Sequence, residues 1–163
     1  LEQISSICKE FGTALILITH DLGVVAGLSD RVIVMYAGKV IEEGETNEIF
    51  NNPRHPYTIG LLNSVPRLNE ERQSELNTIE GAPPDLVKPP TGCPFMARCD
   101  FAKKICNEMP SFDPVVDQPT HHKACWVDVT DPNVQAYAER RRQARREAQI
   151  VAIDEAANVL QGE

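Results

Sequence analysis

The sequence predicts an α/β chain in which the end of a parallel sheet, a β-hairpin and helices are followed by a loop-rich extension and a helical tail. Three observations support this fold class. Residues 13–19, TALILIT, form an unbroken β-prone apolar run, as in a strand buried on both faces. Residues 32–42 alternate about an Ala-Gly pair, as in a β-hairpin. Four cysteines within residues 93–125 follow a proline-rich stretch.

The first 66 residues have the pattern of compact α/β sequence. Apolar residues at helical spacing predict a helix over residues 1–10, which a glycine ends. An acidic residue placed as an N-cap predicts a short helix at 22–28. Two more helices are expected, a short one within 45–52 and a proline-opened one over 56–65.

The character of the chain changes at residue 67. Residues 67–92 are charged and then proline-rich, and we expect an extended connection there. The tail is rich in Ala, Arg, Glu and Gln, which favours a helix over 133–162. We therefore divide the chain into four parts: 1–66, 67–92, 93–127 and 128–163.

Composition and charge exclude several classes of function. The 163 residues, 42% of them hydrophobic, suffice for one ordinary domain. The formal charge of −8 argues against a nucleic-acid partner, whose phosphates require a Lys/Arg excess. The N-terminus lacks the basic and apolar pattern of a signal peptide, and no apolar run approaches the ~20 residues of a membrane span. We expect a cytoplasmic protein, at most peripheral to a membrane.

Five arginines gather between Arg140 and Arg146. Such a run can attract anionic lipid headgroups or RNA weakly. The alternative is a solvated helix face stabilised by Glu139 and Glu147.

His20 directly follows the apolar run at 13–19. Open α/β sheets bind ligands at the carboxyl ends of their strands, so its side chain is placed to donate to a phosphate oxygen or to orient a water. On position alone, an exposed or structural histidine is the alternative.

The four cysteines Cys93, Cys99, Cys106 and Cys125 follow the spacing C-x5-C-x6-C-x18-C. In a chain without a secretory signal, such a cluster favours a metal site over two disulfides. No pair has the close C-x2-4-C spacing that is usual for structural zinc, and the intervals match neither common ferredoxin pattern. The residues alone leave zinc and a [4Fe-4S] cluster as equal options.

Residues 13–44, TALILITHDLGVVAGLSDRVIVMYAGKVIEEG, followed by NEIFNNPRHPYTIGLLNSVP, resemble the C-terminal part of an ABC-type nucleotide-binding domain. The likeness is to the oligopeptide/dipeptide importer branch, in which a segment like HPYT at 55–58 is typical, and it covers about residues 1–127. It implies that His20 is the switch histidine, a catalytic group that contacts the γ-phosphate of ATP and helps position the attacking water.

The same branch includes members with a similar arrangement of GC, RC and later cysteines, some of which hold a [4Fe-4S] cluster. The resemblance implies that Cys93, Cys99, Cys106 and Cys125 bind such a cluster, with zinc as the runner-up. It assigns the ligands to the cysteines, so His121 and His122 are expected beside the site or on the surface.

The sequence lacks three parts of the ATP site: a G-x-x-x-x-G-K-[ST] phosphate loop, an LSGGQ-like signature and an apolar run ending in Asp-Glu for Mg²⁺. We expect a truncated product or a fragment of a longer subunit, unable by itself to bind ATP tightly or to hydrolyse it.

For the full subunit, the resemblance implies an ABC-type ATPase that uses ATP and Mg²⁺ to power oligopeptide or dipeptide import. Its expected partners are a second ABC ATPase subunit, transmembrane permease subunits and, indirectly, a peptide-binding protein, on the inner face of the plasma membrane. The alternatives are a free-standing iron-sulfur or zinc module, and a docking piece on an intact ATPase subunit.

Overall fold

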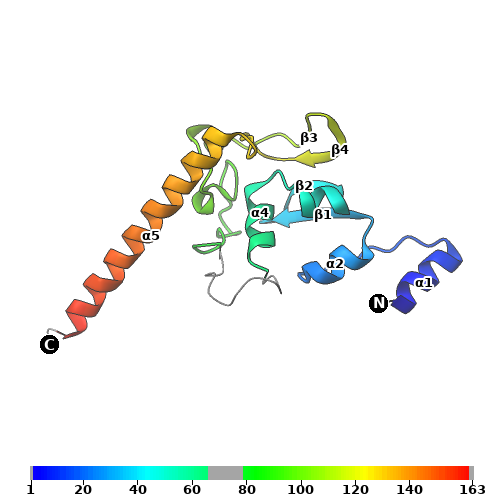
Figure 1. The fold of residues 1–163 in the computed structure, drawn as a ribbon, viewed down its shortest axis with the longest axis horizontal. Coiled ribbons are helices and arrows are strands. Elements are labelled where there is room, and N and C mark those ends of the chain that lie inside the picture. The colour runs from blue at the N-terminus through cyan, green and yellow to red at the C-terminus, as the bar shows by residue number, and fades with distance from the viewer. Residues whose placement is uncertain (1, 66–78, 162–163) are drawn as a thin grey trace.

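The structure is a computed structural model that describes residues 2–65 and 79–161. The described elements make a mixed α/β molecule, with the sheet in the middle, α1 near one end and the long helix α5 at the other (Figure 1). The helices are α1 (Glu2–Phe11), α2 (Leu22–Leu28), α3 (Thr46–Asn51), α4 (Pro56–Asn63) and α5 (Pro132–Gln161), with 3-10 turns at Met96–Arg98 and Lys104–Asn107.

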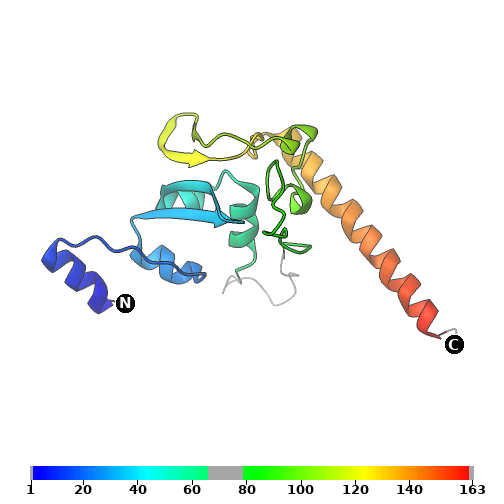
Figure 2. The same ribbon diagram turned by 180° about the vertical axis from the view of Figure 1, so that it is seen from behind.

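Within residues 2–65 and 79–161, four strands form one antiparallel sheet in the order β1-β2-β4-β3. They are β1 (Arg31–Tyr36), β2 (Lys39–Glu45), β3 (Asp113–Val115) and β4 (Gln118–Lys123). The hairpin predicted at 32–42 is β1 and β2, whose two turn residues, Ala37 and Gly38, both have positive φ (49° and 74°), as a twisted two-residue turn requires. Strands β3 and β4 were not predicted from the sequence, and they bring the cysteine-bearing extension against β2 (Figures 1 and 2).

The parallel strand predicted at 13–19 is not formed among the described residues. This segment runs extended without a sheet partner, and Ile16 and Ile18 are 90% and 94% exposed. A strand forms where a neighbour offers N–H and C=O groups, and a run apolar on both faces also needs a covering layer on each side. The described part of the chain provides neither for this segment. The α/β class is therefore confirmed, whereas the observed sheet is antiparallel.

The hydrophobic core lies where the sheet, α4, the extension and the start of α5 meet. The rings of Tyr36, Tyr57 and Phe95 pack against one another at centroid distances of 4.7, 5.3 and 5.4 Å, in tilted and edge-on arrangements that suit aromatic quadrupoles. The buried members of the core are Tyr36, Ile41, Phe95, Cys99, Phe101, Ala102, Val127, Val129, Val134 and Ala138. One core therefore joins segments from both halves of the sequence.

Helix α5 begins at Pro132, after an aspartate cap. The side chain of Asp131 accepts the N–H of Asn133 at 2.8 Å, and proline at the first helical position leaves one fewer orphan donor. Val134 and Ala138, one turn apart, enter the core, and the rest of the helix extends away from it (Figure 2). No helix in the described residues is both long and apolar enough to cross a bilayer.

Candidate functional site

His20 lies at the end of the extended segment, just before α2, and its side chain is exposed. The next residue, Asp21, caps α2 by accepting the N–H groups of Gly23 and Val24 at 2.9 and 3.1 Å. The N–H of Asp21 in turn donates to Oγ1 of Thr19 at 3.0 Å. These bonds fix the backbone on both sides of His20 and leave its imidazole accessible to a group from outside the chain.

The four predicted cysteine ligands come together around one small cavity. Cys93 and Cys99 flank the first 3-10 turn, Cys106 lies in the second, and Cys125 follows β4. The cavity has a volume of about 10 Å³, which is the space of roughly one water molecule. All four residues are free thiols. The fold thus brings the whole predicted set to one place.

Backbone amides face three of these sulfurs. At Cys93, Cys99 and Cys125, the N–H of the residue two positions later interacts with the sulfur, and for Cys125 that donor, the N–H of Val127, lies 3.5 Å from Sγ. Burial raises the pKa of all three thiols, that of Cys125 to about 11, and the amides act in the opposite direction. Amide donors of this kind stabilise metal-bound thiolates and tune their reduction potential.

The donor set fits a thiolate-bound group, but the geometry does not fit a single ion. The cavity lining offers four thiols and no carboxylate. No group of three or more His, Cys, Asp or Glu side chains in the described part of the chain is arranged to hold a metal ion. A tetrahedral zinc site, with Zn–S bonds of about 2.3 Å, requires sulfurs only about 3.8 Å apart. To bind a zinc ion the four sulfurs would have to rearrange around it, whereas to hold an iron-sulfur cluster the cavity, which has room for about one water molecule, would have to widen.

A buried polar cluster that the sequence analysis missed lies near this cavity. Glu42 of β2 is completely buried and accepts the N–H groups of Arg54 and His55, the latter at 3.0 Å. Nε2 of His121 lies 2.8 Å from the same carboxylate, and Nδ1 of His121 lies 3.0 Å from the amide oxygen of Gln118. Nothing in the sequence singled out Glu42, because its partner on β4 is 79 positions away.

His55, the histidine of the HPYT segment, caps helix α4. Its Nδ1 accepts the N–H of Tyr57 at 3.1 Å, and Pro56 occupies the first turn. The side chain is 1% exposed, and this burial lowers the pKa of His55 from 6.5 to about 4. A neutral ring keeps the lone pair that the cap needs. His55 and Pro56 also line the cysteine cavity, so the HPYT segment forms part of its wall.

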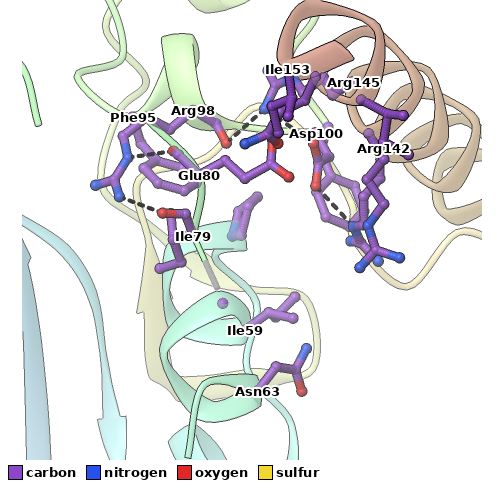
Figure 3. Close-up of a pocket in the computed structure, with 16 residues that line it drawn as sticks. Ile59, Asn63, Ile79, Glu80, Phe95, Arg98, Asp100, Arg142, Arg145 and Ile153 are labelled. Carbon is purple, nitrogen blue, oxygen red and sulfur yellow. Dashed lines mark hydrogen bonds and ion pairs between the residues drawn. The ribbon is translucent and has the colours of Figure 1, made fainter. Parts of the chain in front are cut away.

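The arginines of α5 are not merely a solvated face, because three of them bind the cysteine loop, residues 93–106. Nη1 of Arg141 donates to the carbonyl of Ala102 at 2.8 Å. Nε of Arg142 and Nη1 of Arg145 pair with the Asp100 carboxylate at 3.1 and 3.2 Å, a cluster seen in Figure 3. The tail helix therefore holds the loop that carries Cys99.

Comparison with known proteins relates this chain to one family. Residues 41–106, which include Glu42, His55 and three of the four cysteines, match the family model described as "Oligopeptide/dipeptide transporter, C-terminal region".

Curated relatives extend the similarity over three-quarters of the chain. The oligopeptide transport ATP-binding protein OppD of Salmonella typhimurium is 50% identical over 123 residues, which cover 76% of this chain and 36% of that protein. The dipeptide transport ATP-binding protein DppD of Bacillus subtilis is 48% identical over 127 residues, covering 78% and 37%. The chain thus spans little more than a third of the length of these relatives.

Proposed function

Because this chain matches the C-terminal region of oligopeptide and dipeptide transporter ATP-binding proteins, we propose that it is part of an ATP-binding subunit that powers peptide import. The observation that supports this most strongly is the high identity to relatives named as peptide-transport ATP-binding proteins. In this proposal, the full subunit works with a second ATPase subunit and with permease subunits on the inner face of the plasma membrane.

His20 is the residue through which this region takes part in hydrolysis. Its exposed imidazole, on a backbone fixed by Asp21 and Thr19, is suited to donate to a terminal phosphate oxygen and to orient the attacking water. One such hydrogen bond contributes about 1.5 to 3 kcal/mol. Phosphoryl transfer depends on many positioned groups, so we expect the 163-residue chain alone to show no ATP turnover.

A chimeric subunit tests this role. The chain is joined to the preceding two-thirds of the Salmonella OppD protein at the aligned boundary, and steady-state ATP hydrolysis is measured beside ATP binding. We expect His20→Ala to lower turnover by roughly 10- to 150-fold while binding persists, which is the loss that corresponds to one such hydrogen bond. The control is His122→Ala, whose ring stacks on Phe112 in the β3–β4 region. Turnover that survives His20→Ala unchanged would refute the assignment.

The cysteine cavity supports a second function, the binding of a [4Fe-4S] cluster by Cys93, Cys99, Cys106 and Cys125, with zinc as the alternative. The support is the convergence of four thiols and three amide donors on one cavity. In a [4Fe-4S] cluster each cysteine binds a different iron atom. Such a cluster therefore suits four sulfurs that line the same cavity but are not arranged around a single metal ion. When bound, it would supply a covalent staple between the two 3-10 turns and the end of β4, and a one-electron redox centre.

Anaerobic purification with metal analysis and a visible spectrum distinguishes these possibilities. Brown protein with absorbance near ~400 nm and about four irons per chain supports the cluster. Colourless protein with one zinc per chain favours a zinc staple, and metal-free protein contradicts both. Cys99→Ser is expected to abolish metal binding, and Cys8→Ser, on the distant helix α1, serves as the matched control. Stable metal binding in a chain that associates with no ATPase would favour a free-standing module.

A further inference from the structure

Two of the four cysteines are joined directly through their backbones. The N–H of Cys93 donates to the carbonyl of Cys106 at 2.9 Å. Standard bond lengths add about 1.5 Å between that nitrogen and Cα of Cys93, and about 2.4 Å between the oxygen and Cα of Cys106. The two Cα atoms therefore lie at most about 6.8 Å apart, within the span of roughly 4.4 to 6.8 Å that disulfide-bonded cysteines occupy.

The side chains of this pair share the same small space. Both residues line the cavity of about 10 Å³, which is roughly the room of one water molecule, and both are free thiols. Burial raises the pKa of Cys93, and a negative charge on Cys106 raises it further, as it does for sulfurs that lie near each other. The pair thus meets the second requirement for a disulfide, which is that the two side chains converge.

The backbones that carry the pair are in close contact. A β-carbon on Gly92 would lie 2.5 Å from the backbone of Asn107 and from the carbonyl of Cys106. The N–H of Met96 donates to the carbonyl of Cys93 at 3.1 Å, and Cys106 lies within a 3-10 turn. Because both stretches are fixed in this way, a bond between the two sulfurs requires side-chain rotation and no refolding of the loop.

The two thiols differ in their access to solvent. Cys93 is half-buried, whereas Cys106 is 6% exposed. A reagent from solvent therefore meets Cys93 first, and Cys106 is the neighbour that can react second. An accessible thiol beside a resolving cysteine is the usual arrangement of a redox-sensitive pair.

We propose that Cys93 and Cys106 form a redox-sensitive pair that a small-molecule disulfide, such as oxidised glutathione, converts to an intramolecular disulfide when no metal is bound. The thiolate of Cys93 attacks one sulfur of the oxidant, whose S–S bond breaks and releases one glutathione. The thiolate of Cys106 then attacks Sγ of Cys93 in the mixed disulfide and releases the second glutathione. The two cysteine sulfurs lose two electrons to the oxidant, and their two protons end on the two glutathione thiols.

The disulfide uses two of the thiols that the proposed metal site requires, so a metal and this disulfide exclude each other. The inference concerns the metal-free chain, and it holds whichever metal the four cysteines bind, or if they bind none. A failure of the metal proposal is therefore distinguishable from a failure of this one. Reduced glutathione in excess reverses the reaction and restores all four thiols.

Peptide mapping of the full 163-residue chain tests the pairing. The chain is freed of metal, checked by metal analysis, incubated with oxidised glutathione at about pH 8.5 and alkylated. Trypsin cleaves after Arg98, Lys103 and Lys123, so the four cysteines fall in separate peptides. We expect the Cys93 and Cys106 peptides to be linked at least tenfold more often than any other two, and we expect urea during oxidation to remove this preference. Preference for another pair, no preference, or four alkylated cysteines overturns the proposal.

Variants assign the two roles, all in a Cys8→Ser background that removes the fifth cysteine. In Cys106→Ser, Cys93 lacks its resolving partner and is expected to keep one bound glutathione per chain, as measured by mass spectrometry. Cys99→Ser and Cys125→Ser are the matched controls, and they should form the disulfide at a rate within about twofold of the parent chain. A Cys106→Ser chain that accumulates no mixed disulfide, or a loss of the disulfide in both controls, contradicts these roles.

Thermal unfolding provides a second measurement. A bond between Cys93 and Cys106 closes a ring in the unfolded chain, so the oxidised protein is expected to unfold at a midpoint about 5 °C or more above that of the reduced protein. The Cys106→Ser chain treated in the same way should show no such rise. An oxidised parent chain that unfolds at or below the midpoint of the reduced one would show that the disulfide does not fit this fold.

Discussion

His55 links the buried polar cluster to the pH dependence of stability. Burial holds its pKa at about 4 in the folded chain, against 6.5 for the free side chain, and the Glu42 carboxylate opposes that shift while Lys123 adds to it. As pH falls below about 6.5, the unfolded chain takes up the proton first, so the free energy of unfolding decreases until about pH 4. We expect this loss to reach about 3 kcal/mol, as measured by urea denaturation at a series of pH values.

His55→Asn isolates this contribution, because asparagine keeps a side-chain acceptor for the N–H of Tyr57 but does not titrate. The variant is expected to be less stable at neutral pH, since the His55 ring also packs beside Phe95. Its free energy of unfolding should, however, no longer show the decrease that His55 causes between about pH 6.5 and pH 4. An unchanged slope would mean that His55 is not the group responsible.

Gly92 allows the cysteine loop to close. A β-carbon at this position would lie 2.5 Å from the backbone of Asn107 and from the carbonyl of Cys106, and the next N–H, that of Cys93, donates to the same carbonyl at 2.9 Å. Backbone atoms cannot move aside as a flexible side chain can, so Gly92→Ala should lower the free energy of unfolding by roughly 1 to 3 kcal/mol. The matched change Gly27→Ala, in α2 with open space around it, should be neutral or stabilising by up to about 1 kcal/mol. Thermal denaturation of the two variants compares them directly.

Helix α5 depends on a small residue for its docking. Ala138 is 1% exposed in the core, while Tyr137 and Arg141 donate to the carbonyl of Ala102 at 3.2 and 2.8 Å. Ala138→Asp would bury an unpaired charge, and we expect a loss of about 3 kcal/mol or more, enough to detach the helix. Detachment should expose the Cys99 thiol to a thiol reagent and the arginines of α5 to trypsin. Ala136→Asp lies on the exposed side of the same turn, and it should change neither the rate of thiol modification nor the rate of tryptic cleavage. Equal effects of both variants would argue against docking through the Ala138 face.

Elements that depend on local signals could be predicted from the sequence, and those that depend on distant partners could not. The cap at Asp21, the turn at Ala37-Gly38 and the helix that begins near Pro132 all follow from neighbouring residues. The strands β3 and β4 are short and lack clear alternation, and they form against β2, which is far away in sequence. The prediction of a strand at 13–19 failed for the same reason, since an apolar run becomes a strand only beside a partner.

In the candidate site, too, some residues could be predicted from the sequence and others could not. The four cysteines could be recognised as a group because they lie close together in the sequence, and the resemblance to a known family favoured an iron-sulfur cluster over zinc. Their convergence on one cavity supports that grouping, and the identity of a bound group stays a prediction. Glu42 could not be recognised, because a glutamate in a hairpin normally faces solvent and only the pairing of β2 with β4 buries it against His121.

At the scale of the whole molecule, the described residues leave a β-prone apolar segment uncovered. Along 13–19, Leu15, Ile16, Leu17 and Ile18 are 47%, 90%, 40% and 94% exposed. A segment of this kind with unpaired backbone groups is a template for pairing with another chain. We therefore expect the 163-residue chain alone to self-associate at micromolar concentration, in sedimentation velocity experiments.

Ile16→Lys with Ile18→Lys should raise the concentration at which this self-association begins by roughly tenfold or more, because charges on an exposed strand oppose edge pairing. Val116→Lys removes a single apolar residue that is 83% exposed in the β3–β4 turn, and it should have no such effect. In the chimeric subunit the prediction reverses: if 13–19 becomes the buried strand of a parallel sheet, the same two lysines should prevent folding. A wild-type chain that stays monomeric, together with a chimera that tolerates both lysines, would show that this segment needs no covering layer.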